Sequence, residues 1–397
     1  MKKVLSIIFL AAVLAGCATP QPTVTPTLTV AATEEPTYTP VPTEKATTTP
    51  EPTATVAITP TYPVTGEGPD SYTAGVDPLT GLTVANVDLL NRRPIVVKVQ
   101  NIPRTGRPQY GLTKADLVYE YYTEFGSTRF SAVFYGQDAE RVSPVRSARW
   151  FDFNVVRAYK AVFAFGSAYA DLYSAILNSD FGDRLVLENS TSCPAFCRVD
   201  VNTTNDLAVN TAAMKEYLKS LNIDNTAQDL SGMFFQKQAP EGGEALPSFY
   251  VRYSGSIYNR WDYDAASGRY LRFVDNKDAL GTDPEEYVQL TDALTNQPVA
   301  ADTVVMLLVN HEWIKYGNGS EIINMSLLGN GTAYVARDGK MYQVQWTRAT
   351  HSDVISLINA DGTPFPFKPG QTWFEVLGNS STLEKSESSW RWVWMWP

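Results

Sequence analysis

Several features that would mark a familiar functional class are scarce in this sequence. Its 397 residues include 3 cysteines and 2 histidines, and 32 basic residues stand against 42 acidic ones, a net charge of −10. So few cysteines exclude a disulfide-dense mini-domain. The acidic excess argues against a nucleic-acid partner, because general nucleic-acid binders usually carry a basic excess. A hydrophobic fraction of 44% is still enough for a sizeable core.

Common catalytic and metal-binding motifs are also missing. The chain has no Gly-x-Ser-x-Gly elbow, no His-Glu-x-x-His and no phosphate-binding Gly-x-x-x-x-Gly-Lys loop. Cys193 and Cys197 are poorly spaced for zinc, and His311 and His351 lie far away in the sequence. We therefore expect no metal and no cofactor. An exported setting instead favours a local disulfide between Cys193 and Cys197, across a turn at Pro194.

The first residues carry a targeting signal. A basic start at Lys2 and Lys3 precedes the apolar run Val4–Leu14, and Leu14-Ala15-Gly16-Cys17 is a small-residue cleavage site that ends in cysteine. This pattern resembles a bacterial lipoprotein signal, so residues 1–16 are predicted to be removed and Cys17 to be acylated. The alternative is an ordinary secretory signal. We expect an extracytoplasmic protein anchored to the bacterial membrane by lipid at Cys17.

A Thr/Pro-rich segment follows, at residues 17–73. Between residues 18 and 73 there are 18 threonines and 11 prolines, with no phenylalanine or tryptophan. Such a stretch cannot bury a core, and repeated Thr-Pro favours extended conformations. We predict a disordered stalk. Its threonines are either glycosylated or bare.

Two regions of different pattern come after the stalk. Short apolar strands and amphipathic helices alternate over residues 77–238, which indicates an α/β domain. Strands are expected at 95–100, 117–122, 130–135, 161–165 and 185–187, and helices at 147–159, 168–177 and from a cap at Asp206 to 221.

Residues 245–380 read as a β-rich domain. Strands are expected at 250–253, 257–263, 270–274, 304–309, 333–336, 342–346 and 373–377, and Asp338-Gly339 favours a hairpin turn. The tail at 381–397 has four tryptophans in its last eight residues. It either docks as a final strand, which we favour, or contacts a membrane interface or a partner. The fold class is an α/β N-terminal domain followed by a β-rich C-terminal domain, α+β overall.

A basic island is the best candidate for a site. Residues 92–150 hold ten basic and five acidic residues, a net charge of +5 in an acidic chain. Because ligands collect beyond strand ends and anions at helix starts, we predict an anion site there. Its ligand-binding residues are Arg129, Arg146, Ser147, Arg149, Gly166 and Ser167. The alternative is that Arg146 and Arg149 pair internally with Asp116, Glu120 or Asp152.

A family resemblance appears at several short motifs. They are Arg93-Pro94-Ile95-Val96-Val97, residues 107–112, 115–120, 126–130, Pro144-Val145-Arg146-Ser147-Ala148-Arg149, Trp346 and Pro369-Gly370-Gln371-Thr372-Trp373. In this order they resemble the YerB-like family of proposed bacterial lipoproteins over most of residues 77–377. The chain departs from that pattern at residues 199–205, where it lacks a Pro-His-Asn. A looser similarity is to the LytR-CpsA-Psr ligases.

The resemblance implies a two-part domain of unknown function on a lipid anchor, without established catalytic residues. We expect a protein that binds an anionic cell-wall or lipid-linked ligand. One alternative is an enzyme of phosphoryl or glycosyl-phosphate transfer, with Asp116 or Glu120 as acid or base. Another is a structural adaptor. The identity of a protein partner is left open.

Overall fold

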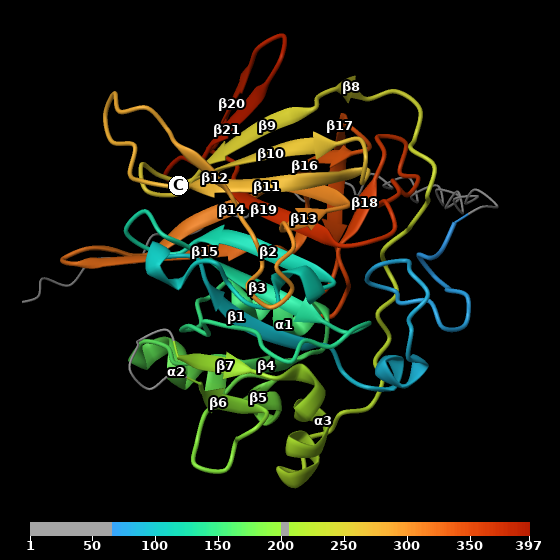
Figure 1. Cartoon of the computed structure of the whole chain (residues 1–397), viewed down its shortest axis with the longest axis vertical. Helices are drawn as coiled ribbons and strands as arrows, with labels where there is room; N and C mark the ends of the chain where they lie inside the picture. The colour runs from blue at the N-terminus through green and yellow to red at the C-terminus, as the bar shows by residue number, and fades with distance from the viewer. Residues whose placement is uncertain (1–65, 200–205) are drawn as a thin grey trace, which may run out of the picture. The chain divides into compact units, whose positions relative to one another are not determined.

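The computed structural model describes residues 66–199 and 206–397. These residues form sheets of twelve, seven and two strands around one hydrophobic core (Figure 1). The signal, Cys17, most of the stalk and the segment that lacks Pro-His-Asn lie outside the described residues. Within the described ranges, no helix is long and apolar enough to cross a bilayer.

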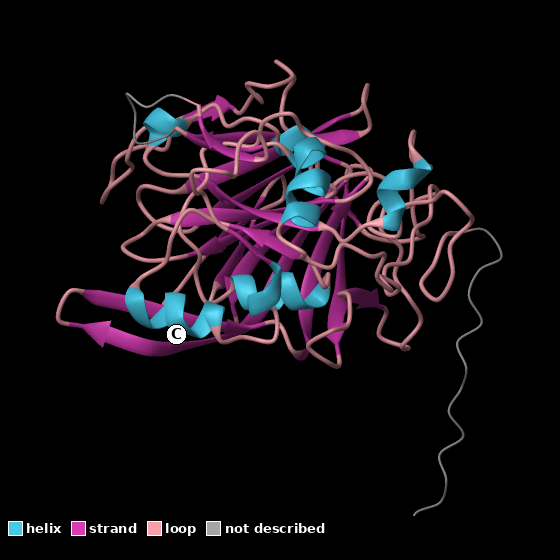
Figure 2. Cartoon of the chain, turned by 90° about the horizontal axis from the view of Figure 1, so that it is seen from below, coloured by secondary structure: helices cyan, strands magenta, loops and turns pink. Residues whose placement is uncertain are grey.

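The first half of the fold mixes strands and helices. Its strands are β1 (Ile95–Gln100), β2 (Leu117–Tyr122), β3 (Thr128–Phe134), β4 (Val162–Ala164), β5 (Leu185–Val186), β6 (Phe196–Arg198) and β7 (Leu207–Val209). Its helices are α1 (Asp152–Ala158), α2 (Ala170–Leu177) and α3 (Thr211–Ser220), with 3-10 turns at Val87–Asn91, Arg104–Gly106, Leu112–Lys114 and Gly182–Arg184. Figure 2 shows the helices around a strand-rich body.

The second half consists of strands. They are β8 (Glu244–Ala245), β9 (Ser248–Arg252), β10 (Tyr258–Asp264), β11 (Arg269–Asp275), β12 (Tyr287–Gln289), β13 (Ala300–Ala301), β14 (Thr303–Gly317), β15 (Ser320–Ser326), β16 (Gly329–Arg337), β17 (Lys340–Arg348), β18 (Ser356–Ile358), β19 (Thr372–Gly378), β20 (Thr382–Lys385) and β21 (Trp390–Val393). This arrangement confirms the fold class that the sequence predicts.

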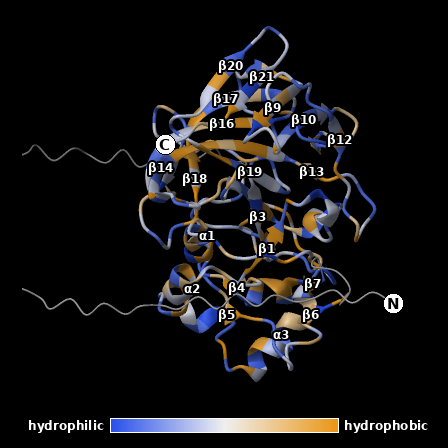
Figure 3. Ribbon diagram, turned by 90° about the vertical axis from the view of Figure 1, so that its left-hand side faces the viewer, coloured by the Kyte–Doolittle hydropathy of each residue, from blue (hydrophilic) through white to orange (hydrophobic). Residues whose placement is uncertain are grey.

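The largest sheet contains strands from both halves. Its order is β18-β17-β16-β14-β19-β2-β3-β1-β4-β5, with β15 beside β14 and β8 beside β17. The halves meet where β19 runs parallel to β2. All residues of β1, β2 and β19 are buried, as expected for central strands covered on both faces. Figure 3 shows the hydrophobic colour concentrated on strands such as β14 and β16. The domain boundary near residue 240 stays a prediction.

A second sheet, in the order β12-β11-β10-β9-β21-β20 with β13 beside β11, packs on the first. Arg272 of β11 crosses the contact and pairs with Glu120 of β2 and, at 2.8 Å, with Glu375 of β19. Trp261 and Trp373 also meet here, with ring centroids 5.4 Å apart. The two sheets therefore share both apolar and ionic contacts.

The Trp-rich tail contributes β21, the last strand in the sequence, to this second sheet. β21 pairs parallel with β9 and antiparallel with β20. Trp394 stacks on Tyr122 with ring centroids 3.9 Å apart. The tail thus docks as a final strand, as predicted.

Two local predictions are confirmed. Arg337 pairs with Lys340 across Asp338-Gly339, both of which have positive φ, so this dipeptide forms the β16–β17 hairpin. Cys193 and Cys197 form a disulfide.

The predicted starts of the first two helices were early, by five residues for the helix predicted from Ser147 and by two for the helix predicted from Ala168. α1 begins at Asp152 rather than Ser147, because residues 146–148 are extended and pair through their backbone with Lys98 and Ser167. α2 begins at Ala170, three residues after Ser167.

The predicted cap of the third helix was also wrong. Residues 207–209 form β7, and Asn210 caps α3 by accepting from the Ala213 N–H at 3.1 Å. Asp206 instead accepts from Arg198 at 3.1 Å. Pairing with β6 holds the apolar residues Leu207–Val209 in a strand. This long-range pairing outweighs the local helical pattern.

The described chain begins earlier than the predicted end of the stalk. The Glu67 N–H donates to the Phe235 carbonyl at 3.0 Å, and the Tyr72 hydroxyl donates to the Met233 carbonyl at 2.6 Å. Residues 66–73 therefore pack against residues 233–235.

Candidate functional site

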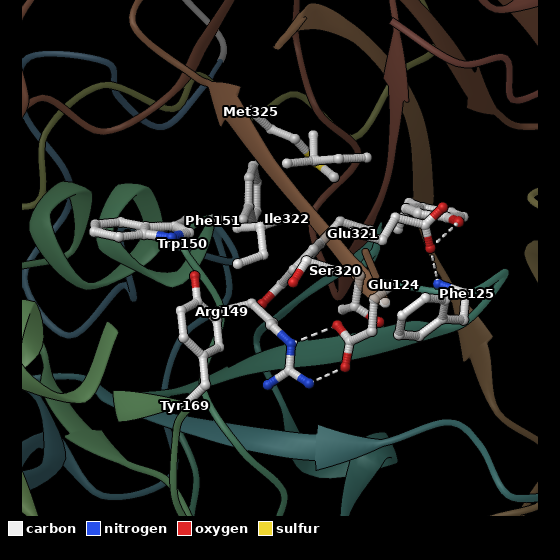
Figure 4. A pocket seen from close by; sticks show the side chains of 15 residues that line it. Glu124, Phe125, Arg149, Trp150, Phe151, Tyr169, Ser320, Glu321, Ile322 and Met325 are labelled. Carbon is white, nitrogen blue, oxygen red and sulfur yellow. Dashed lines mark hydrogen bonds and ion pairs between the residues drawn. The ribbon is translucent and has the colours of Figure 1, made fainter. Parts of the chain in front are cut away.

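A pocket of about 270 Å³ lies where the first half of the chain meets the β14–β15 hairpin (Figure 4). Its walls come from the end of β2 and the turn that follows, the residues before α1, the residue before α2, and β15. The lining residues are Tyr121, Tyr122, Thr123, Glu124, Phe125, Arg149, Trp150, Phe151, Tyr169, Gly319, Ser320, Glu321, Ile322, Ile323 and Met325.

The turn after β2 places Glu124 in this pocket. The Thr123 N–H donates to the Ser127 carbonyl at 2.9 Å and closes the turn into β3. Gly126 has φ +72, and a Cβ there would lie 3.1 Å from Ser254. A side chain at this position would be both strained and crowded. The turn therefore depends on glycine.

Two arginines converge on Glu124. The Arg149 guanidinium donates from Nε to Glu124 Oε2 at 2.5 Å and from Nη2 to Oε1. Nη2 of Arg129 lies 3.5 Å from the same Oε1. Both arginines also donate to the Ser147 carbonyl, at 2.7 Å from Arg129 and 3.5 Å from Arg149. The side chains of Arg129 and Arg149 are 16% exposed and that of Glu124 is 22% exposed.

Burial and neighbouring charges shift the pKa values of Arg129 and Glu124. Burial and the neighbouring charge of Arg149 lower the pKa of Arg129 to about 10. Burial favours the neutral form of Glu124, but the hydrogen bond and charge of Arg149 outweigh it and lower the pKa of Glu124. The single carboxylate of Glu124 therefore interacts with two guanidinium groups.

A fully buried Lys98–Asp152 pair lies behind the arginines. Asp152 accepts from Lys98 Nζ at 3.2 Å, Tyr121 hydroxyl at 2.6 Å and the backbone N–H of Arg149 at 2.6 Å. Ser131 also donates to it, at 2.5 Å. Burial lowers the pKa of Lys98 to about 7, although Asp152 opposes this shift. Asp152 thus fixes the backbone that carries Arg149.

Two buried donors on the pocket wall have no hydrogen-bond partner. They are Trp150 Nε1 and the Tyr169 hydroxyl. Burial raises the pKa of Tyr169 to about 12, and the nearby Trp150 partly opposes this shift. The two groups are close enough for a hydrogen bond from Trp150 to be the cause of that opposition, but their distance and angle fall short of a regular one.

A further carboxylate occupies the opposite wall. Glu321 of β15 accepts from the Tyr122 hydroxyl at 3.1 Å and from the Phe125 backbone N–H. It thereby joins the hairpin to the turn after β2. Figure 4 shows it beside Phe125 and apart from the Arg149–Glu124 pair.

The structure brings together Arg129, Ser147 and Arg149 but places the other predicted anion ligands differently. The Arg146 side chain donates to Gln100, and burial lowers its pKa. The Arg146 carbonyl accepts from the Gly166 N–H at 2.9 Å, and the Ser167 carbonyl accepts from the Ala148 N–H at 2.7 Å. Gly166 and Ser167 therefore meet this segment through backbone bonds, not at a helix start.

Asp116 lies outside the pocket and is paired within the fold. Its Oδ2 accepts from the Tyr135 N–H and, at 3.1 Å, from the Gly136 N–H, and it lines a separate hollow with Asp77. Burial raises the pKa of Asp77 to about 6, and burial with the charge of Asp77 raises that of Asp116. Both carboxyls cap backbone turns.

Glu120 is fully buried between the two sheets. Besides Arg272, it accepts from Asn101 Nδ2 at 3.0 Å and from the Thr128 hydroxyl at 2.7 Å. Burial raises its pKa to about 7, although Arg272 opposes the shift. Across the ranges that the structure describes, no group of three or more His, Cys, Asp or Glu side chains is arranged to hold a metal.

Several residues of the pocket escaped the sequence reasoning. Trp150 directly follows the predicted Arg149, and Glu124 was counted only as a charge. The β14–β15 hairpin had a readable signal, Gly317-Asn318-Gly319, because Asn-Gly favours two-residue hairpin turns. Tyr169 had no such signal.

Comparison with known proteins agrees with this fold. Residues 79–225 match the N-terminal domain of the protein of unknown function DUF3048, and residues 249–374 match its C-terminal domain. The chain is 27% identical over 337 residues to "Putative lipoprotein YerB" of Bacillus subtilis (strain 168), which covers 80% of this chain and 92% of that protein.

The crystal structure of YerB from Bacillus subtilis superposes with a TM-score of 0.63 at 24% identity. It covers 76% of this chain and 96% of that one, and this likeness shows the shared fold. The two matched domains follow each other as N-terminal and C-terminal domain and cover most of the described chain. They therefore identify the family. The chain belongs to the DUF3048 family of proteins of unknown function.

Proposed function

We propose that this chain is a lipid-anchored extracytoplasmic protein that binds an anionic ligand of phosphate or carboxylate type through Arg149 and Arg129. The cleavage signal that ends at Cys17 supports the anchor. The name of the Bacillus relative as a lipoprotein supports the same location for this chain.

The observation that carries the proposal is the convergence of Arg129 and Arg149 on one partly exposed carboxylate beside a pocket. Arg129 and Arg149 share Glu124, whereas the buried Lys98, whose pKa is lowered to about 7, pairs with Asp152, and Glu321 lies on the opposite wall. Because burial and a neighbouring cation lower the pKa of Arg129 to about 10, an added anion would be favourable there. Arginine forks suit the oxygens of phosphate or carboxylate groups.

Trp150 Nε1 and the Tyr169 hydroxyl supply the second support. An unpaired buried donor costs free energy that a ligand acceptor can recover. Both donors stand on the same wall as Arg149 (Figure 4). An anion between them would receive one charged and two neutral hydrogen bonds.

We propose that the remaining predicted residues position the two arginines and do not contact the ligand. Gly166 and Ser167 hold residues 146–148 through backbone bonds, and that segment carries the Ser147 carbonyl to which both arginines donate. Arg146 supports the same segment through its side-chain hydrogen bond to Gln100.

The test is calorimetric titration of the full chain with phosphate, pyrophosphate and citrate. Arg149→Gln and Arg129→Gln should weaken binding of at least one of these anions about tenfold or more, with folding nearly intact. Arg157→Gln is the matched control, because Arg157 pairs with Asp180 at 2.7 Å and does not line the pocket. It should leave binding unchanged.

Two outcomes would refute the proposal. One is that the parent chain binds none of the three anions. The other is that Arg149→Gln and Arg129→Gln bind as well as the parent but unfold several degrees earlier, since that would make both arginines structural.

A further inference from the structure

The pocket separates polar groups from apolar ones. In Figure 4 the Arg149–Glu124 pair and the Tyr169 ring lie at one end, and Phe151, Ile322 and Met325 lie at the other. The unpartnered Trp150 Nε1 faces the polar side, near the Tyr169 hydroxyl. A ligand that satisfies both ends must itself have a polar and an apolar part.

The apolar end belongs to rigid parts of the fold. Phe151 and Met325 are each 2% exposed, and Ile323 is 6% exposed. The Phe151 ring packs on Tyr121 of β2 with centroids 4.4 Å apart. The Met325 carbonyl accepts from Asn154 of α1 at 2.9 Å, so α1 holds β15 in place. The apolar walls are therefore preformed rather than assembled by the ligand.

We propose that the ligand is a small anionic amphiphile, with a phosphate- or carboxylate-type head on one ring or on a chain of about six carbons. This inference rests on the proposed function of the same site. The head would meet Arg149, Tyr169 and Trp150, and the apolar group would lie against Phe151, Ile322 and Met325.

The size of the pocket sets the limit on the apolar group. A cavity of roughly 150 Å³ is enough for benzene, so a pocket of about 270 Å³ holds one ring together with an anionic head. A bare inorganic anion would leave the apolar walls in contact with water, which is unfavourable. A long acyl tail would extend beyond the walls and add little.

The experiment is calorimetric titration of the full chain with probes that share one head group: inorganic phosphate, ethyl, butyl, hexyl and decyl phosphate, and phenyl phosphate. Each buried methylene should tighten binding about fourfold. We expect the affinity to rise to hexyl phosphate, to level off at decyl phosphate, and to be at least about tenfold higher for phenyl phosphate than for phosphate. Phenol is the uncharged control and should bind far more weakly than phenyl phosphate.

Paired variants separate the two ends of the pocket. Ile322→Ser should reduce the advantage of phenyl phosphate over phosphate at least about fivefold. Ile314→Ser is the matched control, since Ile314 lies on the same hairpin, is 48% exposed and does not line the pocket. Arg149→Gln should weaken binding of every phosphate in the series by a similar factor.

The possible failures are distinguishable. If phosphate and phenyl phosphate bind equally to the parent chain, the amphiphile inference is wrong and the anion site stands. If phenol binds as tightly as phenyl phosphate, and Arg149→Gln changes neither, then both the anion site and the amphiphile are refuted. An absence of binding by every probe also refutes both.

Discussion

At the residue scale, Glu124 occupies the two arginines that we propose for an anionic ligand. Its carboxylate binds the guanidinium of Arg149 through two oxygens and also faces Arg129. It stands on the short turn between β2 and β3 and is 22% exposed. A ligand would compete with Glu124 for the same donors.

This competition gives the first prediction. Glu124→Gln keeps the size of the side chain but removes its charge, so pyrophosphate should bind the variant at least about tenfold more tightly, a gain of about 1.4 kcal/mol. Calorimetric titration measures it. Glu321→Gln, on the opposite wall, controls for loss of a pocket carboxylate and should have a smaller effect. Weaker binding by Glu124→Gln would show that Glu124 helps to hold the ligand or the site.

The Asp77–Asp116 pair gives a pH prediction. Burial raises the pKa of Asp77 to about 6, whereas an unfolded aspartate ionises near its ordinary value of 3.8. Between these values the folded chain binds more protons than the unfolded one. The stabilising contribution of Asp77 is therefore complete below about pH 4 and is lost as the pH rises through about 6.

Asp77→Asn cannot ionise and should lack this decline. The difference in free energy of unfolding, parent minus variant, should fall by about 2 kcal/mol between pH 4 and pH 7. Thermal melting across that range measures it, with exposed Asp283→Asn as the control for loss of one carboxyl group. Parallel curves for parent and Asp77→Asn would mean that folding does not raise the pKa of Asp77.

At the scale of elements, regular patterns were predictable and long-range pairings were not. β1 and β2 have the predicted bounds, because a run of apolar residues between turn signals specifies a buried strand. Residues 207–209 form a strand because β6 lies beside them and Val142 and Val145 bond to their backbone. β14 continues well past the predicted Val309, because its polar outer half is held by β15 rather than by burial.

The same distinction applies to the site. Arg129 and Arg149 could be chosen from the sequence, since they belong to a basic island in an acidic chain. The meeting of Arg149 with Tyr169 and β15 in one pocket depends on tertiary packing, which leaves no local pattern. Arg146 was chosen by the same rule but points to Gln100 instead.

The Trp-rich tail allows a prediction on one element. Trp392 is 1% exposed within β21 and meets Phe249 edge to face, with ring centroids 5.9 Å apart. Trp392→Ala should cost about 3 to 5 kcal/mol of stability through the cavity it leaves. Trp396→Ala, at a side chain that is 48% exposed, should cost about 1 kcal/mol or less. Chemical denaturation measures both, and equal small losses would mean that the tail is not part of the core.

At the scale of the whole molecule, the two halves are joined by one sheet and by a buried ionic group. Glu120 and Glu375 stand side by side in β2 and β19 and share Arg272 from the second sheet. The second sheet also receives Arg104 and Arg107, which both pair with Asp275, at 2.6 and 2.9 Å. We therefore expect residues 66–397 to unfold cooperatively.

The boundary of this unit gives the fourth prediction. A chain that starts at Gly66 should melt at about the temperature of the mature chain. One that starts at Gly75 should melt several degrees lower, because it loses the bonds of Glu67 to Phe235 and of Tyr72 to Met233. Scanning calorimetry compares the two chains with the mature protein. Identical melting of all three would show that residues 66–74 add nothing to stability.

The most direct test of the proposed anion site is a crystal structure of the full chain grown or soaked with phenyl phosphate. The account predicts a phosphate group within hydrogen-bond distance of the Arg149 guanidinium and the Tyr169 hydroxyl, with Glu124 turned away from Arg149. The ring should lie against Phe151 and Met325. An Arg149–Glu124 pair that stays intact at saturating ligand, with the pocket free of phosphate, would contradict it.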